Sequence, residues 1–499
     1  MRSIKSIAPE HGLPDTVPER ALGHAVRKNN LRMLVICQAL GLAALALIVY
    51  LIMSGNYRIL KYVVCLAPAL LVIPKPSLTP YLFILNFFVQ FDLFGSNRML
   101  RVMFIDAVFL FLIMAFVSNN RNNYKEAIGR QRPLFIILCV FMLWAVIGIV
   151  VNCYDHTNIV NVTSAFFVFN IAQLAAAVVI FSHSAWKEHR DRIILFYVIC
   201  SFVEIVIAIL LRYKEGAKTF SEFYKLTGTL GVHPGMLANL LLLSFGVALC
   251  AFFELRNKYE KRFSLCVAVM CIFTVILFGT RSVLLGLFLG IPMVALLNVN
   301  YKWTILAVIL LLAVGAVGAP FIKWTVIHIL AGSPDSINAG FSSYGRVLIW
   351  ERVYEHALYG PWLQKIFGIG IGSFNTLKFS YYLEVGTFTT GAHNNLLHAF
   401  VETGIIGMLI FIAIWVEIIR NLVIRIKKYK DNAARSFLLC TLILLFSGLT
   451  QETFWFNPSY GRFWMQYIIF YLIIFNFRDE DRFVLAEKHN PAIISVGQK

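Results

Sequence analysis

The stretch LFIILCVFMLWAVIGIVV, residues Leu134–Val151, contains no charged side chain. An apolar run close to the roughly 20 residues that an α-helix needs to cross about 30 Å of hydrocarbon indicates a transmembrane helix. Similar runs recur along the whole chain and leave no room for a large water-soluble domain. We therefore predict an all-α, polytopic integral membrane protein with about 12–14 transmembrane helices.

The composition of the chain points to the same class of protein. Of its 499 residues, 59% are hydrophobic and 14% are charged. A water-soluble fold does not have enough interior to bury that much apolar surface. The net charge of +18 does not indicate nucleic acid, because the basic residues are scattered among separate short loops instead of forming one face interleaved with aromatic side chains. We expect these residues to contact membrane lipids instead.

The candidate transmembrane helices follow the apolar runs. We expect them near Met33–Met53, Leu60–Ile73, Tyr81–Leu93, Val102–Val117, Leu134–Val151, Ile159–Phe181, Ile193–Leu211, Gly235–Leu255, Phe263–Phe278, Val283–Leu297, Trp303–Ile322, Ala399–Ile419, Phe437–Leu449 and Phe463–Phe477. This divides the chain into a segment 1–32, about eleven helices over 33–322, a long outer loop over 323–398, about three helices over 399–477 and a tail over 478–499.

Basic residues set the predicted orientation. Short connections rich in Lys and Arg, at 121–132, 187–192, 256–262 and 420–435, fall on the same side of the membrane as the N-terminus. Because short cytoplasmic loops carry an excess of Lys and Arg, we expect both termini to be cytoplasmic. No cleavage pattern follows the first span, so we expect that span to remain as an anchor.

Two long connections, 212–233 and 323–398, fall on the outer side, and long ordered loops commonly carry function. The longer one contains a stretch, Tyr344–Leu358, with the pattern of an amphipathic helix. Its apolar residues at helical spacing are Val347, Trp350, Tyr354 and Leu358. Such a helix either lies on the membrane surface or packs over the helix bundle as a lid.

The segment Gly279-Thr280-Arg281-Ser282 interrupts an apolar run that is too long for one helix, so we predict a helix break there at the outer face. An arginine in this setting persists only where it snorkels, pairs or faces a polar cavity. The guanidinium fork of Arg281 suits a diphosphate, because two parallel hydrogen bonds combine charge with geometry. The alternative is that Arg281 only reaches lipid headgroups.

A second polar group, His393-Asn394-Asn395-Leu396-Leu397-His398, leads into Glu402 at the start of a span. His398 and Glu402 are four residues apart and share a helix face. We expect the helix N-terminus to present free backbone N–H groups to an anion, and His393 to act as a general base for a sugar hydroxyl. The alternatives are that Asn394 only caps the helix and that Glu402 only pairs with His398.

Other patterns bear on competing classes of protein. The glycines of Gly368-x-Gly370-x-Gly372 mimic a nucleotide-binding loop, but they lack its strand–turn–helix context. The nine cysteines have no metal-site spacing, so we expect no metal, no cofactor and no disulfide framework. A proton-coupled transporter would use membrane-embedded carboxylates such as Asp106, Glu204 and Glu417, but the sequence shows no internal repeat typical of that class.

From about Thr227 to Phe411, motifs in a fixed order resemble the bacterial O-antigen ligase/polymerase superfamily. These motifs are Gly231-x-His233-Pro234, Thr280-Arg281-Ser282, Arg346-x-x-x-Trp350, Gly368-x-Gly370-x-Gly372-Ser373-Phe374, His393-Asn394-x-x-Leu397 and Glu402-x-Gly404-x-x-Gly407. Thr280 stands where the superfamily usually has serine. The N-terminal spans match only by being hydrophobic.

The resemblance implies a long periplasmic loop over a cavity that faces the outer leaflet, and metal-independent transfer of a glycan from a polyprenyl diphosphate to a hydroxyl acceptor. It implies that Arg281 and Arg346 hold the diphosphate, that His393 deprotonates the acceptor or positions the diphosphate, and that Glu402 orients the site. Further candidate substrate-binding residues are Arg212, by position alone, and Asn394, His398 and His233.

We therefore expect a polymerase of the bacterial inner membrane that joins lipid-linked repeat units into O-antigen, capsule or exopolysaccharide. One alternative is a ligase that moves finished glycan onto lipid A core or protein. The other is a transporter of polysaccharide or lipid-linked sugar. The expected partners are the lipid-linked oligosaccharide, membrane lipids and, by analogy, a chain-length regulator and a flippase, with no nucleic acid.

Overall fold

The computed structural model describes residues 78–88, 128–129, 131–152, 167–182, 189–214, 234–277, 281–296, 343–374, 391–450 and 463–475. The chain divides into two compact units, Met1–Pro76 and Ser77–Lys499, and every described residue belongs to the second. The predicted spans at 33–53, 60–73, 102–117 and 303–322 lie outside the described residues, as do both chain ends.

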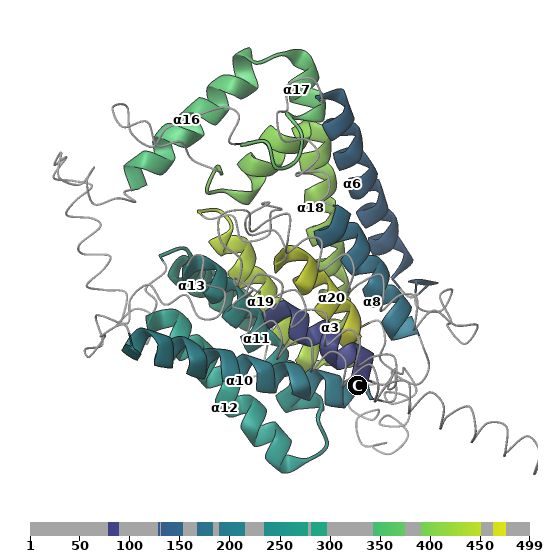
Figure 1. The fold of residues 1–499 in the computed structure, drawn as a ribbon, viewed down its shortest axis with the longest axis vertical. Helices are drawn as coiled ribbons and strands as arrows, with labels where there is room; N and C mark the ends of the chain where they lie inside the picture. Colours follow the sequence, from purple (N-terminus) through teal and green to yellow (C-terminus); the bar gives the residue numbers. More distant parts are fainter. Residues whose placement is uncertain are drawn as a thin grey trace, which may run out of the picture. The chain divides into compact units, whose positions relative to one another are not determined.

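The described part of the chain consists of helices and their connections and contains no strand (Figure 1). The helices are α3 (Thr79–Phe88), α6 (Arg132–Val151), α8 (Gln173–Ser182), α10 (Arg190–Lys214), α11 (Pro234–Glu254), α12 (Lys258–Leu277), α13 (Arg281–Leu296), α16 (Ser343–Tyr359), α17 (Trp362–Phe367), α18 (Asn395–Tyr429), α19 (Asn432–Ser447) and α20 (Phe463–Phe475), with a π-helical segment, η3 (Phe167–Ala172), before α8. The predicted all-α fold is confirmed.

Four of the described helices are long and apolar enough to cross a membrane. They comprise Arg132–Val151, Arg190–Leu210, Leu237–Glu254 and Asn395–Tyr429. Shorter apolar helices lie at Asn170–Ser182, Leu285–Val294, Asn432–Ser447 and Phe463–Phe475. On α6, the apolar side chains of Leu143 and Val150 are each 62% exposed on the protein surface. Lipid rather than water suits such a surface, so the polytopic membrane architecture is confirmed.

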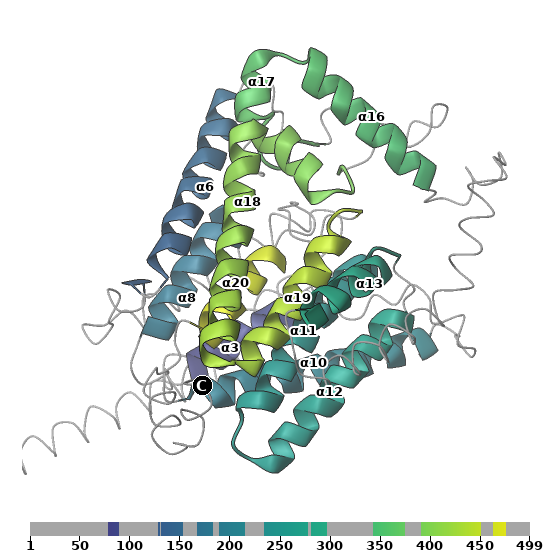
Figure 2. The same ribbon diagram turned by 180° about the vertical axis from the view of Figure 1, so that it is seen from behind.

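Two helix pairs organise the described bundle. Helix α6 runs alongside α18, and α13 lies against α19, as both ribbon views show (Figures 1 and 2). The α13–α19 contact depends on small residues, because a Cβ added to Gly286 would meet the carbonyl oxygen of Ile443 and the hydroxyl of Ser447. Close approach of backbones at glycine is a common way for membrane helices to associate without a hydrophobic driving force.

A buried arginine at the start of α10, Arg190, joins α10 to α11 and α20. The Arg190 guanidinium pairs with Glu254 of α11 at 2.5 Å, and it also donates to the carbonyl oxygens of Ile473 and Ile474 at the end of α20. The last carbonyls of a helix have no partner within the helix itself. Arg425 of α18 donates to the next one, Phe475 O. The end of α20 is therefore fixed to α10, α11 and α18.

Helix α12 ends at Leu277 and α13 begins at Arg281. The residues between them, 278–280, lie outside the described residues, so the helix break predicted at Gly279-Thr280 stays a prediction.

Replacing Gly286 by alanine tests the α13–α19 contact. The added methyl group collides with the α19 backbone, so we expect the free energy of unfolding to fall by about 1–3 kcal/mol. The matched control is Gly129→Ala, because a Cβ at Gly129 meets nothing within 4 Å. Thermal unfolding of the purified protein in detergent measures both changes. Equal stability of the two variants would contradict the close contact.

Candidate active site

Helix α18 is interrupted near its start. Gly404 has φ +68°, and a Cβ there would meet the carbonyl oxygen of Ile366, so this backbone conformation requires glycine. The interruption leaves the carbonyl oxygens of Val401 and Glu402 available to the segment that follows α17. They accept hydrogen bonds from the N–H groups of Ile369, at 2.9 Å, and Gly370, at 3.0 Å. The loop after α17 is thus bonded directly to the backbone of α18.

The side chain of Glu402 continues this attachment. One carboxylate oxygen accepts the Gly372 N–H at 2.8 Å, and the other accepts the Phe374 N–H at 3.0 Å. The second oxygen also lies 3.1 Å from Nε2 of His398, one helical turn earlier. Glu402 and His398 are each only 1% exposed. The pairing that the sequence left as an alternative is therefore present, and Glu402 additionally orders the loop 368–374, which we call the glycine loop.

The glycine loop directs its N–H groups inward. Gly368, Gly370 and Gly372 all have φ between +73° and +96°, a region that other residues rarely adopt. The N–H groups of residues 368–370 and 372–374 donate to Gln364, Val401, Glu402 and Gly370 within the protein. These groups are therefore not available to cradle a phosphate, which gives a physical reason why the resemblance to a nucleotide-binding loop is superficial.

Helix α6 supports the same segment from the other side. The Trp144 Nε1–H donates to the Thr403 carbonyl at 2.9 Å, and the indole ring stacks on Phe367 with centroids 4.9 Å apart. Asn152, just past the end of α6, donates to the Gly368 carbonyl at 2.9 Å. The sequence analysis did not identify Trp144 or Asn152. The only local signal is that a tryptophan N–H in an apolar helix needs a hydrogen-bond acceptor.

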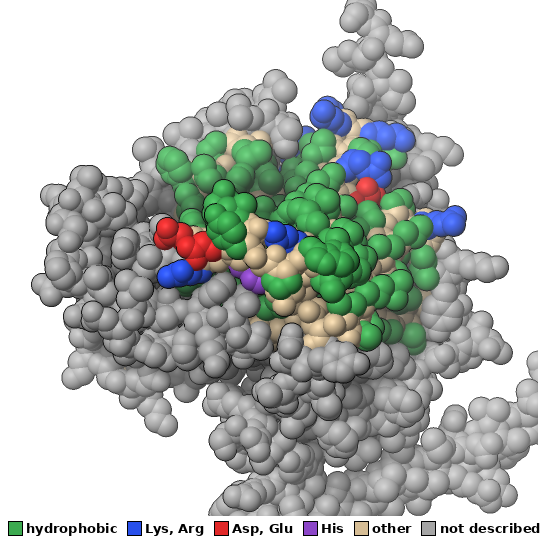
Figure 3. Space-filling view, turned by 90° about the horizontal axis from the view of Figure 1, so that it is seen from above, with side chains coloured by type: hydrophobic (Ala, Val, Ile, Leu, Met, Phe, Trp, Pro, Cys, Tyr) green, Lys and Arg blue, Asp and Glu red, His purple; other side chains and the backbone are tan. Residues whose placement is uncertain are grey.

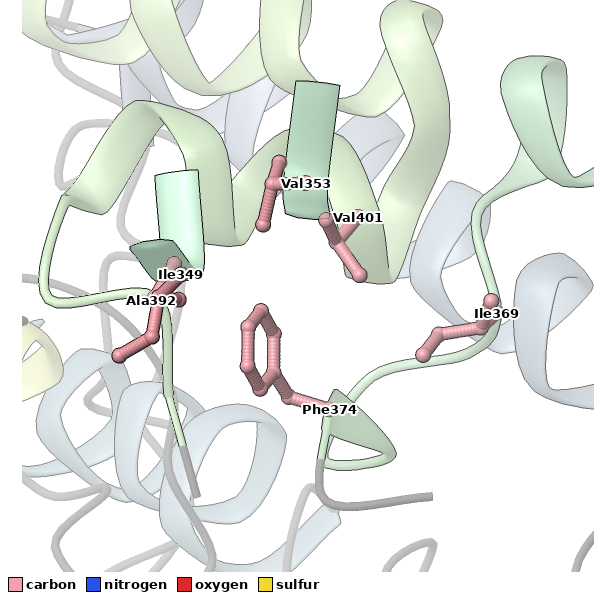
Figure 4. Close-up of a cluster of buried hydrophobic side chains, with 6 residues drawn as sticks. All are labelled: Ile349, Val353, Ile369, Phe374, Ala392 and Val401. Carbon is pink, nitrogen blue, oxygen red and sulfur yellow. The ribbon is translucent and has the colours of Figure 1, made fainter. Parts of the chain in front are cut away.

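An apolar cluster lies beneath α16 (Figure 4). Its buried members come from α16, the glycine loop, the segment just before α18, and α18 itself; they are Ile349, Val353, Ile369, Phe374, Ala392 and Val401. Trp350 packs against the cluster and donates its Nε1–H to the Ala392 carbonyl at 2.9 Å. Helix α16 thus packs on the glycine loop and the start of α18, as the lid interpretation predicted.

The predicted apolar side of α16 is not the side that packs on the site. Tyr354 is 63% exposed and Leu358 is 46% exposed, whereas Ile349 and Val353 are buried. The glycine loop and α18 contact the side of α16 that carries Ile349 and Val353. Helical spacing alone did not distinguish this side from the neighbouring apolar side, because both repeat at three or four residues.

His393 has a strained backbone at the mouth of α18. Its φ of +51° lies in the left-handed region, which costs a non-glycine residue about 1–3 kcal/mol. Its two neighbours are held, Ala392 by the hydrogen bond from Trp350 and Asn394 by the cap of α18. Because such strain persists only where the surroundings impose it and often marks functional sites, it favours the predicted role of His393.

The expectation of free N–H groups at the start of α18 is wrong. The Asn394 side-chain oxygen accepts from Leu396 and Leu397, and its amide nitrogen donates to the Leu449 carbonyl. The N–H groups of Asn395 and His398 donate to Gly448 O and Asn394 O. The capping alternative for Asn394 is thus present, and an anion at this position would be bound by side chains rather than by these four N–H groups.

The segment 447–450, which comprises the last residue of α19 and the turn after it, connects α18 with α13. It contacts the start of α18 through the hydrogen bonds to Gly448 and Leu449, while Ser447 contacts α13 at Gly286. Arg281 begins α13 only five residues before Gly286. The backbone of Arg281 and the segment His393-Asn394 therefore flank the same turn.

For the other predicted site residues, the structure describes the backbone alone, or the residue lies outside the described part of the chain. Arg346 lies in the first turn of α16 and Arg212 near the end of α10, but neither side chain is described, nor is that of Arg281. His233 lies outside the described residues. Among the side chains that are described, no group of three or more His, Cys, Asp or Glu lies close enough to hold a metal ion.

Comparison with known families bears on this site directly. The family model described as O-antigen ligase matches residues 266–412. This segment of the chain is similar to the O-antigen ligase family. The match confirms the resemblance to the O-antigen ligase/polymerase superfamily and favours glycosyl transfer of the ligase or polymerase type. No curated protein matches the chain.

The matched segment includes most of the site but not all of it. It contains α13, α16, α17, the glycine loop and the first half of α18. The supporting residues Trp144 and Asn152, and the turn 447–450, lie outside it. The motif at Gly231-x-His233 precedes the matched segment, so that part of the resemblance stays a prediction.

Glu402→Gln tests the order of the glycine loop. A glutamine amide keeps one acceptor oxygen and turns a donor toward the second N–H group, so we expect a loss of about 1–3 kcal/mol in the free energy of unfolding. The control is Glu355→Gln, which alters an exposed pair with Arg352 worth about 0.2–1 kcal/mol. Thermal unfolding compares the two variants. A Glu402 variant as stable as its control would refute the conclusion that Glu402 holds the glycine loop.

Trp144→Phe tests the support from α6. Phenylalanine keeps an aromatic ring against Phe367 but loses the hydrogen bond to Thr403, so we expect faster hydrogen exchange in peptides covering 362–374. Trp464→Phe is a matched control, since it removes a buried hydrogen bond to Asn170 elsewhere in the bundle. If both variants left exchange in 362–374 unchanged, α6 would not be supporting this segment.

Proposed function

We propose that this protein polymerises polyprenyl-diphosphate-linked oligosaccharide repeat units at the outer leaflet of a bacterial plasma membrane. The match to the O-antigen ligase family supports glycosyl transfer in general. The observation that carries the specific proposal is the strained His393, held between two anchored neighbours beside the turn that α13 also contacts. The reaction needs a general base, for which His393 is the candidate. It also needs a positive charge for the diphosphate, for which Arg281 at the start of α13 is the candidate.

The reaction breaks the bond between the anomeric carbon and the diphosphate oxygen. The oxygen of an acceptor hydroxyl forms the new glycosidic bond, and its proton passes to His393 as general base. Negative charge grows on the departing diphosphate. Arg281 and Arg346 stabilise that charge through paired N–H groups, and this interaction strengthens as the bond breaks.

Glu402 serves as a positioning residue in this scheme. Both of its carboxylate oxygens are engaged with the glycine loop and His398, so it holds the geometry of the site and does not need to touch substrate. Asn394 has a similar role, because its side chain fixes the start of α18 to the turn 447–450.

A ligase is the second candidate. The description of the matching family model, O-antigen ligase, favours it directly. Both reactions use the same donor and the same leaving group, and they differ in the acceptor. In the polymerase the acceptor is a sugar hydroxyl of another lipid-linked glycan, and in the ligase it is lipid A core or a protein.

Purified full-length protein in liposomes tests the chemistry. With lipid-linked repeat units alone, we expect chain growth without added nucleotide or metal. Arg281→Ala and His393→Ala should lower the rate by at least about 10²-fold, as removal of a transition-state hydrogen-bond donor or of a general base does. Arg352→Ala is the control, because Arg352 forms an exposed ion pair on α16.

The acceptor determines how the result is interpreted. Transfer to an added lipid A core acceptor, with no growth from repeat units alone, would identify a ligase and refute the polymerase. Absence of transfer to either acceptor by the folded protein would refute both reactions.

A further inference from the structure

The corner between α16 and α17 exposes large apolar side chains. Leu358, Tyr359, Trp362 and Leu363 fall within six residues, and Tyr359 and Trp362 are 84% and 66% exposed. We call these four residues the corner patch. The view from above shows hydrophobic side chains covering much of the described face, with few charged groups among them (Figure 3). A contiguous apolar surface of this kind indicates an interaction surface.

The contacts of helix α6 indicate the depth of the corner in the membrane. Asn152 at the end of α6 bonds to Gly368, directly after α17, and Trp144 bonds to Thr403 of α18. At 1.5 Å per residue these two positions are about 12 Å apart along α6. The exposed apolar side chains of α6 continue to Val150 and Val151, so the hydrocarbon reaches almost to Asn152. Helix α17 therefore lies at the boundary between hydrocarbon and water.

The chemistry of the corner fits that boundary. Tyrosine and tryptophan concentrate at membrane interfaces, where an aromatic body meets lipid and a polar atom meets water. The Lys365 ammonium donates to the Leu358 carbonyl at 2.6 Å, which satisfies the exposed end of α16 while leaving a positive charge beside the patch. Partial burial and the nearby Lys365 lower the pKa of His356, so this histidine is neutral near pH 7.

We propose that the corner patch is a membrane anchor that inserts Tyr359, Trp362 and Leu363 into the headgroup region of the lipid bilayer. The exposed apolar strip on α6, which includes Leu143 and Val150, leads to the same corner and argues for lipid as the occupant. The charged residues Glu351, Arg352 and Glu355 lie one to two turns before the patch along α16, where the helix leaves the corner.

The anchor has a consequence for the site. The glycine loop follows α17 directly and is held to α18 by Glu402, so a fixed corner keeps the loop at the depth of the lipid headgroups. A diphosphate carried on a polyprenyl chain lies at that depth. This consequence rests on the proposed function, whereas the anchoring itself does not.

Brominated lipids test the anchor in full-length protein reconstituted into liposomes. Emission from Trp362 is obtained as the difference between the wild type and Trp362→Phe, a conservative change at an exposed position. We expect lipid brominated near the headgroup to remove most of this emission, and lipid brominated deep in the acyl chain to remove less. The matched control is Trp350→Phe on the neighbouring helix α16, because Trp350 is partly buried against the apolar cluster and should report little quenching by either lipid.

Two results would overturn the proposal. Quenching of Trp362 by aqueous iodide and not by brominated lipid would place the corner in water. Quenching by neither agent would show that protein, either a second copy or a partner, covers the patch. Neither result bears on glycosyl transfer, so the anchor and the proposed function fail separately.

Discussion

The carboxylate of Glu402 accepts hydrogen bonds from Gly372 and Phe374 and lies beside His398, almost completely removed from solvent. An ionised carboxylate in that environment is costly unless donors surround it. The donors come from the glycine loop and from the first turn of α18, so the charge is compensated only when these segments pack against each other. The apolar cluster under α16 and the support from α6 form around that closed arrangement.

The interruption of α18 at Gly404 makes this arrangement compatible with a membrane. Backbone carbonyls without partners are expensive in hydrocarbon, and irregular backbone is tolerated there only where protein or water satisfies it. Here the freed carbonyls of Val401 and Glu402 accept from the glycine loop, and that of Thr403 accepts from Trp144. The short first part of α18 is thereby separated from its long second part without leaving these polar groups unpaired.

Local relationships were predictable from the sequence, and distant ones were not. The four-residue spacing of His398 and Glu402 and the capping propensity of Asn394 follow from rules that act within one or two turns. The contacts of Trp144 and Asn152 join residues more than 200 positions apart, and helical periodicity carries no information about such partners. For the same reason the sequence did not show that Ile349 and Val353 are the residues of α16 that pack on the site.

The arginine at position 190 has a consequence for how the chain is made. Its guanidinium is buried with Glu254, and the carbonyls that complete its hydrogen bonds, Ile473 and Ile474, are synthesised more than 280 residues later. Until α20 has entered the membrane, α10 carries an incompletely satisfied charge. The packing around Arg190 is therefore completed only after α20, the last described helix, has been inserted, so a helix made late in synthesis fixes helices that were inserted long before it.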